Sequence, residues 1–231
     1  MLWYKGWLET RLKLLFILGI IGLFLYATHL DIPNARTSFI LFQVTSFGQM
    51  MALTICAMLA GAGINTQPAL QATKGLHGST LFTLSLPVSR LRLIAVRAGI
   101  GWLETVCAIA LYYSAMWFYS PLLRAKVAPF DLVKYAVTLI VCASVIYCLS
   151  VLLAAFLDEI WRVYSTMFGA GLLVWLSSHF SLPTSIDFVR AAGKNSPLFT
   201  HSMPWSAMVF SLGLSVALFY AALKVAQARE Y

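Results

Sequence analysis

The chain has 231 residues, of which 61% are hydrophobic and only 10% are charged. Soluble domains carry roughly 25% charged residues, and a soluble fold of this length could not bury so much apolar surface, so the composition excludes a soluble globular protein. Because basic residues at membrane edges meet anionic lipid headgroups, we assign the net charge of +8 to membrane lipids as partners and expect no nucleic acid.

Six long apolar runs divide the chain. A helix that crosses a bilayer needs about 20 residues, and continuous apolar runs predict helices rather than the alternating strands of a membrane barrel. We therefore predict an all-α integral membrane protein in which residues 1–231 form one transmembrane domain. The six predicted spans are residues 12–30, 39–64, 93–119, 132–157, 163–182 and 205–223.

Residues 1–13 predict a helix that lies at the membrane surface before the first span. Trp3 and Trp7 are four residues apart and share a helical face. Lys5 and Arg11 add cations that suit lipid phosphates. The segment is either a plain membrane anchor or an elbow helix that helps to receive a partner.

The distribution of basic residues predicts the orientation. The connections on the side of the N-terminus hold ten of the 16 Lys and Arg residues. Since cytoplasmic connections carry the excess of Lys and Arg, we expect a multi-pass protein of the cell (inner) membrane with both termini in the cytoplasm.

The segment between the second and third spans, residues 65–92, has its own character. It begins with polar residues, continues with an apolar ridge and then reaches a proline, which ends or breaks a helix. We predict a short amphipathic helix at the cytoplasmic surface, with an ordinary interfacial loop as the alternative. The residues that suit contact with a partner protein are Leu81, Phe82, Leu84, Leu86, Pro87, Ser89, Arg90 and Arg92.

Residues 78–90, GSTLFTLSLPVSR, resemble the signature of ABC-2-type transporter permeases, the membrane subunits of ABC exporters. The resemblance extends to the layout of six spans with an elbow helix, a cytoplasmic coupling helix between spans two and three, and short re-entrant helices between spans five and six, here residues 183–204. The chain departs from the family just before Gly78, where many members carry an acidic residue and this chain has Lys74 to His77.

The resemblance implies a division of labour. Two permease copies, as a homodimer or a heterodimer, form the substrate pathway, and two copies of a separate ABC ATPase subunit bind ATP and Mg and dock on the segment between spans two and three. The chain has no GxxxxGK[ST] phosphate loop, so we expect no bound cofactor and no enzyme activity of its own.

Glu104 is the one acidic residue deep in a predicted span. A carboxylate there costs about 2.5–3.5 kcal/mol on insertion scales, so it calls for a partner or water. Arg97 lies seven residues earlier on nearly the same helical face. The pair is either structural glue between helices, part of the pathway or its coupling, or a proton relay.

Two further features predict contacts near helix ends. Gly99 and Gly101 in the third span, and Gly169 and Gly171 in the fifth, give small surfaces for close helix approach, within one subunit or between two. In the short connection after the fourth span, Asp158 and Arg162 are four residues apart and are expected to pair as solvated helix-end charges. Contact with the ATPase is the alternative for this connection.

The remaining polar residues predict neither a catalytic nor a metal site. The four cysteines fall inside predicted spans without a CxxC pair, and the four histidines are scattered. An intramembrane enzyme or an ion-gradient-driven secondary transporter is the alternative to an exporter subunit.

Overall fold

The computed structural model describes residues 2–28, 37–60, 90–157, 159–180 and 182–228. Within these ranges the chain forms helices joined by turns, and no strand occurs. The helices are α1 (Leu2–Thr28), α2 (Thr37–Leu59), α4 (Arg90–Tyr119), α5 (Pro121–Lys126), α6 (Pro129–Leu153), α7 (Glu159–His179), α8 (Phe188–Ala192), α9 (Pro197–Thr200) and α10 (Trp205–Ala228).

Several helices are suited to a membrane. Among the described residues, four stretches are long and apolar enough to cross one: Phe39–Leu59, Ile94–Tyr119, Pro129–Leu153 and Trp205–Val225. They lie in α2, α4, α6 and α10, so the structure is that of an all-α, multi-pass membrane protein. The first and fifth predicted spans are also helical, as α1 and α7, but α1 contributes only the shorter apolar stretch Lys13–Leu23.

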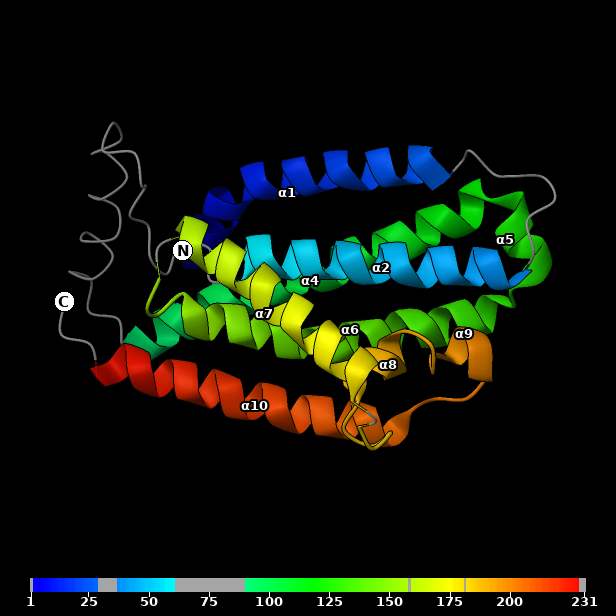
Figure 1. Ribbon diagram of the computed structural model, residues 1–231. Helices are drawn as coiled ribbons and strands as arrows, with labels where there is room; N and C mark the ends of the chain where they lie inside the picture. The colour runs from blue at the N-terminus through cyan, green and yellow to red at the C-terminus, as the bar shows by residue number, and fades with distance from the viewer. Residues whose placement is uncertain (1, 29–36, 61–89, 158, 181, 229–231) are drawn as a thin grey trace.

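The long helices run side by side, with α6 at the centre (Figure 1). Helix α6 contacts α2, α4, α7, α8, α9 and α10, while α1 packs mainly on α4. The burial of the helices agrees with this central position of α6, since 56% of the apolar stretch of α6 is buried and only 28% of that of α10. The hydrophobic core therefore surrounds α6, and α1 and α10 lie at the periphery.

The bundle has two distinct ends (Figure 1). The first turns of α1, α4 and α7 and the last turns of α2, α6 and α10 lie at one end, which we call the terminus end. The short helices α5 and α9 lie at the other end, which we call the far end. The two helix ends that flank residues 61–89 are therefore both at the terminus end.

Several helix boundaries differ from those predicted by a few residues. The described parts of the predicted surface helix and of the first span, residues 2–28, form the single helix α1 without a break. The fourth predicted span, 132–157, was placed too late: α6 begins at Pro129, whose fixed φ suits a first helical position, and ends at Leu153. Helix α5 was not predicted, although Ser120 and Pro121 supply an N-cap and a first-turn proline, and the Ser120 side chain accepts a hydrogen bond from the Leu123 N–H.

Candidate functional site

The residues predicted to dock an ATPase fall mostly outside the described residues. Arg90 is the first residue of α4, and Arg92 is exposed in its first turn. The residues that lie outside are Leu81, Phe82, Leu84, Leu86, Pro87 and Ser89.

The predicted interfacial residues lie in the first part of α1. Trp3 and Lys5 belong to its first turns, Trp7 is 46% exposed, and Arg11 is exposed. An exposed tryptophan and an exposed arginine at the terminus end suit a headgroup layer, and their role there stays a prediction.

Arg162, near the start of α7, is buried deep in the bundle. It is 2% exposed and has the largest volume of the fully buried side chains in the described part of the chain. Its guanidinium donates hydrogen bonds to the carbonyls of Ala57 (3.4 Å), Met58 (3.5 Å) and Ala60. The last carbonyls of a helix lack partners within the helix and carry partial negative charge. Arg162 therefore ties the start of α7 to the end of α2.

This position corrects the prediction of a solvated helix-end charge at Arg162. Asp158, its expected partner, lies outside the described residues. The four-residue spacing predicted a local partner for Arg162, but the carbonyls that it contacts are about 100 residues earlier in the sequence. Only the packing of α7 on α2 brings them together.

Gly101 allows α4 to approach both α2 and α6. A Cβ atom at Gly101 would lie 2.6 Å from the Tyr147 hydroxyl and 2.9 Å from the Leu59 carbonyl oxygen. The Tyr147 hydroxyl donates a 2.6 Å hydrogen bond to the carbonyl of Ala98, and the Trp102 ring packs edge-on against that of Tyr147. The small surface predicted at Gly101 thus serves packing within one chain.

The predicted intramembrane pair is buried. Arg97 is 7% exposed and Glu104 is 8% exposed, both on α4. Glu104 and Arg162 are each close enough to Tyr147 to act electrostatically on its hydroxyl. We refer to these three polar side chains of α4, α6 and α7, which influence one another electrostatically, as the inner polar cluster: Glu104, Tyr147 and Arg162. Among the described residues, no group of His, Cys, Asp or Glu is arranged to hold a metal ion.

At the start of α8, Asp187 fastens the chain to the end of α7. Asp187 is 3% exposed and accepts hydrogen bonds from the Ser177 hydroxyl (2.8 Å) and the Arg190 N–H (2.9 Å). The Arg190 guanidinium lies 3.2 Å from the same carboxylate and donates to the carbonyls of Ser177 and Phe180. Sequence reasoning missed this cluster, although an Asp in front of a short helical stretch is an N-cap signal.

A second carboxylate fastens the end of α9 to α6. His201 Nδ1 lies 2.7 Å from Asp131 Oδ2, and Lys134 Nζ lies 3.0 Å from Asp131 Oδ1 and donates to the His201 carbonyl. His201 adopts a left-handed conformation (φ 55°) at the C-cap of α9. With Asp187 holding its beginning, the α8–α9 segment is fixed at both ends.

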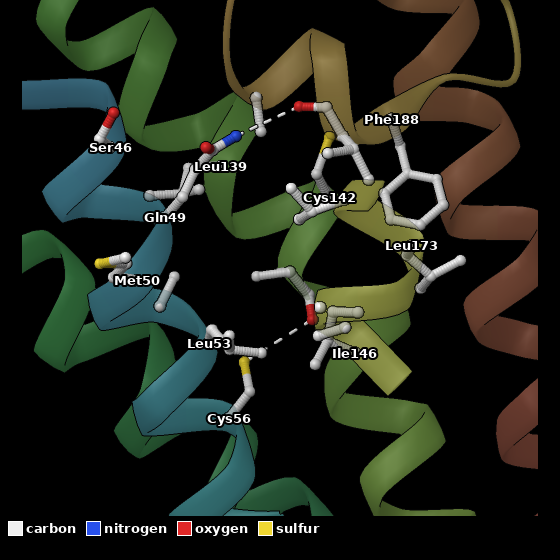
Figure 2. Close-up of a pocket in the computed structure, with 17 residues that line it drawn as sticks. Ser46, Gln49, Met50, Leu53, Cys56, Leu139, Cys142, Ile146, Leu173 and Phe188 are labelled. Carbon is white, nitrogen blue, oxygen red and sulfur yellow. Dashed lines mark hydrogen bonds between the residues drawn. The ribbon is translucent and has the colours of Figure 1, made fainter. Parts of the chain in front are cut away.

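A cavity of about 390 Å³ lies between α2, α6, α7 and α8 (Figure 2). Its size falls within the ~300–1,000 Å³ typical of small-molecule sites. The α2 side chains that face it recur every three or four residues and so share one helical face. The lining residues are Ser46, Gln49, Met50, Ala52, Leu53, Cys56, Leu139, Cys142, Ala143, Ile146, Ala170, Gly171, Leu173, Val174, Phe188, Val189 and Ala192.

The cavity is almost wholly apolar. None of the residues that line it is charged. Its most polar side chain, Gln49, donates a 3.2 Å hydrogen bond to the Val189 carbonyl, and the Cys56 thiol lies 3.7 Å from the Ala143 carbonyl (Figure 2). These groups are therefore turned toward protein partners. The arrangement suits an apolar ligand.

The cavity opens sideways between α2 and α7. Met50 on α2 is 62% exposed, Val174 on α7 is 53% exposed, and Gly171 is also exposed. The α6 side, in contrast, is buried at Cys142 and Ala143. No sequence signal pointed to this cavity. The small residue Gly171 predicted close approach of a neighbouring helix, and most other lining residues look like any apolar residue of a span.

The chain was compared with protein-family models, curated proteins and solved structures, and none of the three comparisons found a match.

Proposed function

We propose that this protein is the membrane-spanning permease subunit of an ATP-driven exporter, which forms a substrate pathway with a second copy and receives energy from separate ATPase subunits. In this proposal α1 and α7 join α2, α4, α6 and α10 as membrane spans. The terminus end faces the cytoplasm of the cell (inner) membrane, as the Lys and Arg distribution favours.

The attachment of the end of α2 by Arg162 carries the proposal. The last turn of α2 and the first turn of α4 flank residues 61–89, the segment proposed to dock an ATPase. Arg162 joins the end of α2 to α7, and Gly101 brings α4 against both Leu59 and Tyr147. Packed helices shift as rigid elements. A force on this segment would therefore reach α2, α4, α6 and α7 together.

The inner polar cluster supports coupling better than catalysis. Within the described ranges, Arg162 and Tyr147 both donate to backbone carbonyls of neighbouring helices. An intramembrane enzyme would need a nucleophile beside a base in hydrogen-bond reach, whereas these contacts hold helices together. We assign Glu104 to the same coupling region, with Arg97 toward the cytoplasm.

The α8–α9 segment supports a cap at the outer side of the pathway. Both short helices pack on α6, and the clusters at Asp187 and Asp131 fix them there. Backbone that is not in a spanning helix is tolerated at membrane depth where protein covers it. We therefore propose that residues 183–204 are re-entrant.

Co-purification tests the proposal. The tagged chain is isolated in mild detergent, and associated proteins are identified by mass spectrometry. We expect an ABC ATPase subunit with the native chain and its loss when Leu84 and Leu86 are both replaced by Asp. The matched control replaces Leu182 and Ile186, two exposed apolar residues near the far end, by Asp and should retain the ATPase.

Three results would contradict the exporter proposal. A native chain that purifies folded and without an ATPase removes its energy source. Transport by the purified chain driven by an ion gradient would identify a secondary transporter, and turnover of a substrate without ATP would identify an intramembrane enzyme.

A further inference from the structure

We propose that the cavity between α2, α6, α7 and α8 binds the acyl chain of a bilayer phospholipid, which enters sideways between α2 and α7. This site does not depend on the proposed ATPase partner. The inference rests on the chemistry of the lining, the depth of the opening and the burial of the α6 side.

The lining selects an apolar chain over water. A buried water molecule needs two to four polar partners, and the lining places Gln49 and Cys56 against the carbonyls of Val189 and Ala143 instead. With no charged residue in the lining, nothing there would recognise an ionic ligand. An unfilled gap leaves its lining atoms without dispersion partners, and a flexible hydrocarbon chain supplies them.

The opening lies where the ends of acyl chains are found. Met50 is about 20 Å along α2 from Thr37 and about 14 Å from Leu59, at 1.5 Å per residue. Gly171 is near the middle of α7, about 18 Å from Glu159 and about 12 Å from His179, and Val174 lies about one turn further along. Since the hydrocarbon core is about 30 Å thick, the opening faces the centre of the bilayer. A phospholipid whose headgroup stays at the surface would present the methyl end of its chain there.

The α6 side of the cavity distinguishes a bound chain from surrounding lipid. Cys142 is 4% exposed and Ala143 is 6% exposed, with α2 and α7 on either side (Figure 2). Lipid at the outer surface of the bundle cannot touch these residues without entering between the two helices. Contact with Cys142 or Ala143 is therefore specific to a chain inside the cavity.

Two glycines provide a matched pair of variants. Gly171 lines the cavity at its opening, whereas Gly213 lies on α10. Both are helical and exposed, and a Cβ atom at either position meets nothing within 4 Å. Gly171→Trp should therefore fold and fill the opening, and Gly213→Trp adds the same side chain elsewhere.

Photo-crosslinking tests the proposal. The full chain is placed in phosphatidylcholine nanodiscs that contain a small fraction of phosphatidylcholine with a diazirine near the methyl end of one chain. After irradiation, adducts are mapped by mass spectrometry. We expect adducts on Cys142 or Ala143 in the native chain and in Gly213→Trp, and their loss in Gly171→Trp. Adducts on exposed α1 residues such as Phe16, which is on a different helix from either substitution, should stay constant in all three and serve as the internal reference.

Either of two results would overturn the proposal. One is labelling of Phe16 without labelling of the α6 residues in the native chain. The other is equal labelling of the α6 residues in Gly171→Trp. Should Gly171→Trp not purify as a folded protein, Gly171→Leu blocks the same opening with a smaller side chain, and the same two criteria apply.

Discussion

Replacing Arg162 by alanine is expected to release the end of α2 from α7. Hydrogen bonds to a charged group contribute about 1.5–3 kcal/mol, and the contact with the Ala60 carbonyl is closer than those with Ala57 and Met58, at 3.4 and 3.5 Å. The interaction of a cation with a helix C-terminus adds up to about 2 kcal/mol in partly buried geometry. We expect the free energy of unfolding to fall by about 3 kcal/mol.

The assay is thermal unfolding of the purified chain in detergent, followed by size-exclusion chromatography. For a chain of 150–250 residues, each kcal/mol shifts Tm by roughly 2–4 °C, so Arg162→Ala should lower Tm by about 6–12 °C. Arg162→Lys keeps the charge but loses the planar fork of donors, so its Tm should lie between those of the native chain and of Arg162→Ala.

Arg124→Ala is the matched control, because Arg124 is exposed on α5 and such surface changes stay within about 0.5 kcal/mol. Equal Tm values for Arg162→Ala and Arg124→Ala would refute the idea that Arg162 holds the end of α2.

Three further substitutions test other contacts. Gly48→Ala should lower Tm in the same assay, because its Cβ would overlap the Tyr113 hydroxyl and overpacking costs about 1–3 kcal/mol. Partial recovery of Tm in Gly48→Ala combined with Tyr113→Phe checks the cause. Asp187→Ala should lower the free energy of unfolding by about 1–3 kcal/mol, because it leaves buried donors at Ser177 and Arg190 unsatisfied. Limited proteolysis should then cut the α8–α9 segment faster, and an unchanged rate of cleavage would contradict this. Under the proposed function, Glu104→Gln should keep the ATPase bound but lose the effect of the permease on its hydrolysis rate, and an unchanged rate would count against a coupling role.

The helices themselves could be predicted because the hydrogen bonds that form them lie within one short segment of the chain. In lipid, each backbone N–H and C=O must be satisfied within its own segment, so a long apolar run is enough to predict a helix. This is why α2, α4, α6 and α10 appear where the apolar runs stand in the sequence. Helix ends depend on caps and on neighbouring chain, which explains why the end of α6 was misplaced.

The contacts between helices could not be predicted in the same way. A helix that is apolar on all sides gives no sign of which face will meet a neighbour. The cavity is therefore absent from any reading of the sequence, although Cys56 and Cys142 were both noted as residues within spans. The partner of Gly101 was equally open, between a second copy and the same chain, until α2 and α6 were seen beside it.

The sequence by itself determined that most of this protein lies in lipid, that it is helical, and where polar residues interrupt the apolar runs. Composition and local hydrogen bonding decide all three. Only the tertiary structure decided that Arg162 is buried against the end of α2, that Asp187 and Asp131 fix the α8–α9 segment, and that α2, α6, α7 and α8 leave a cavity between them. Each of these joins residues distant in sequence, and such contacts follow from how the helices pack together rather than from any single helix.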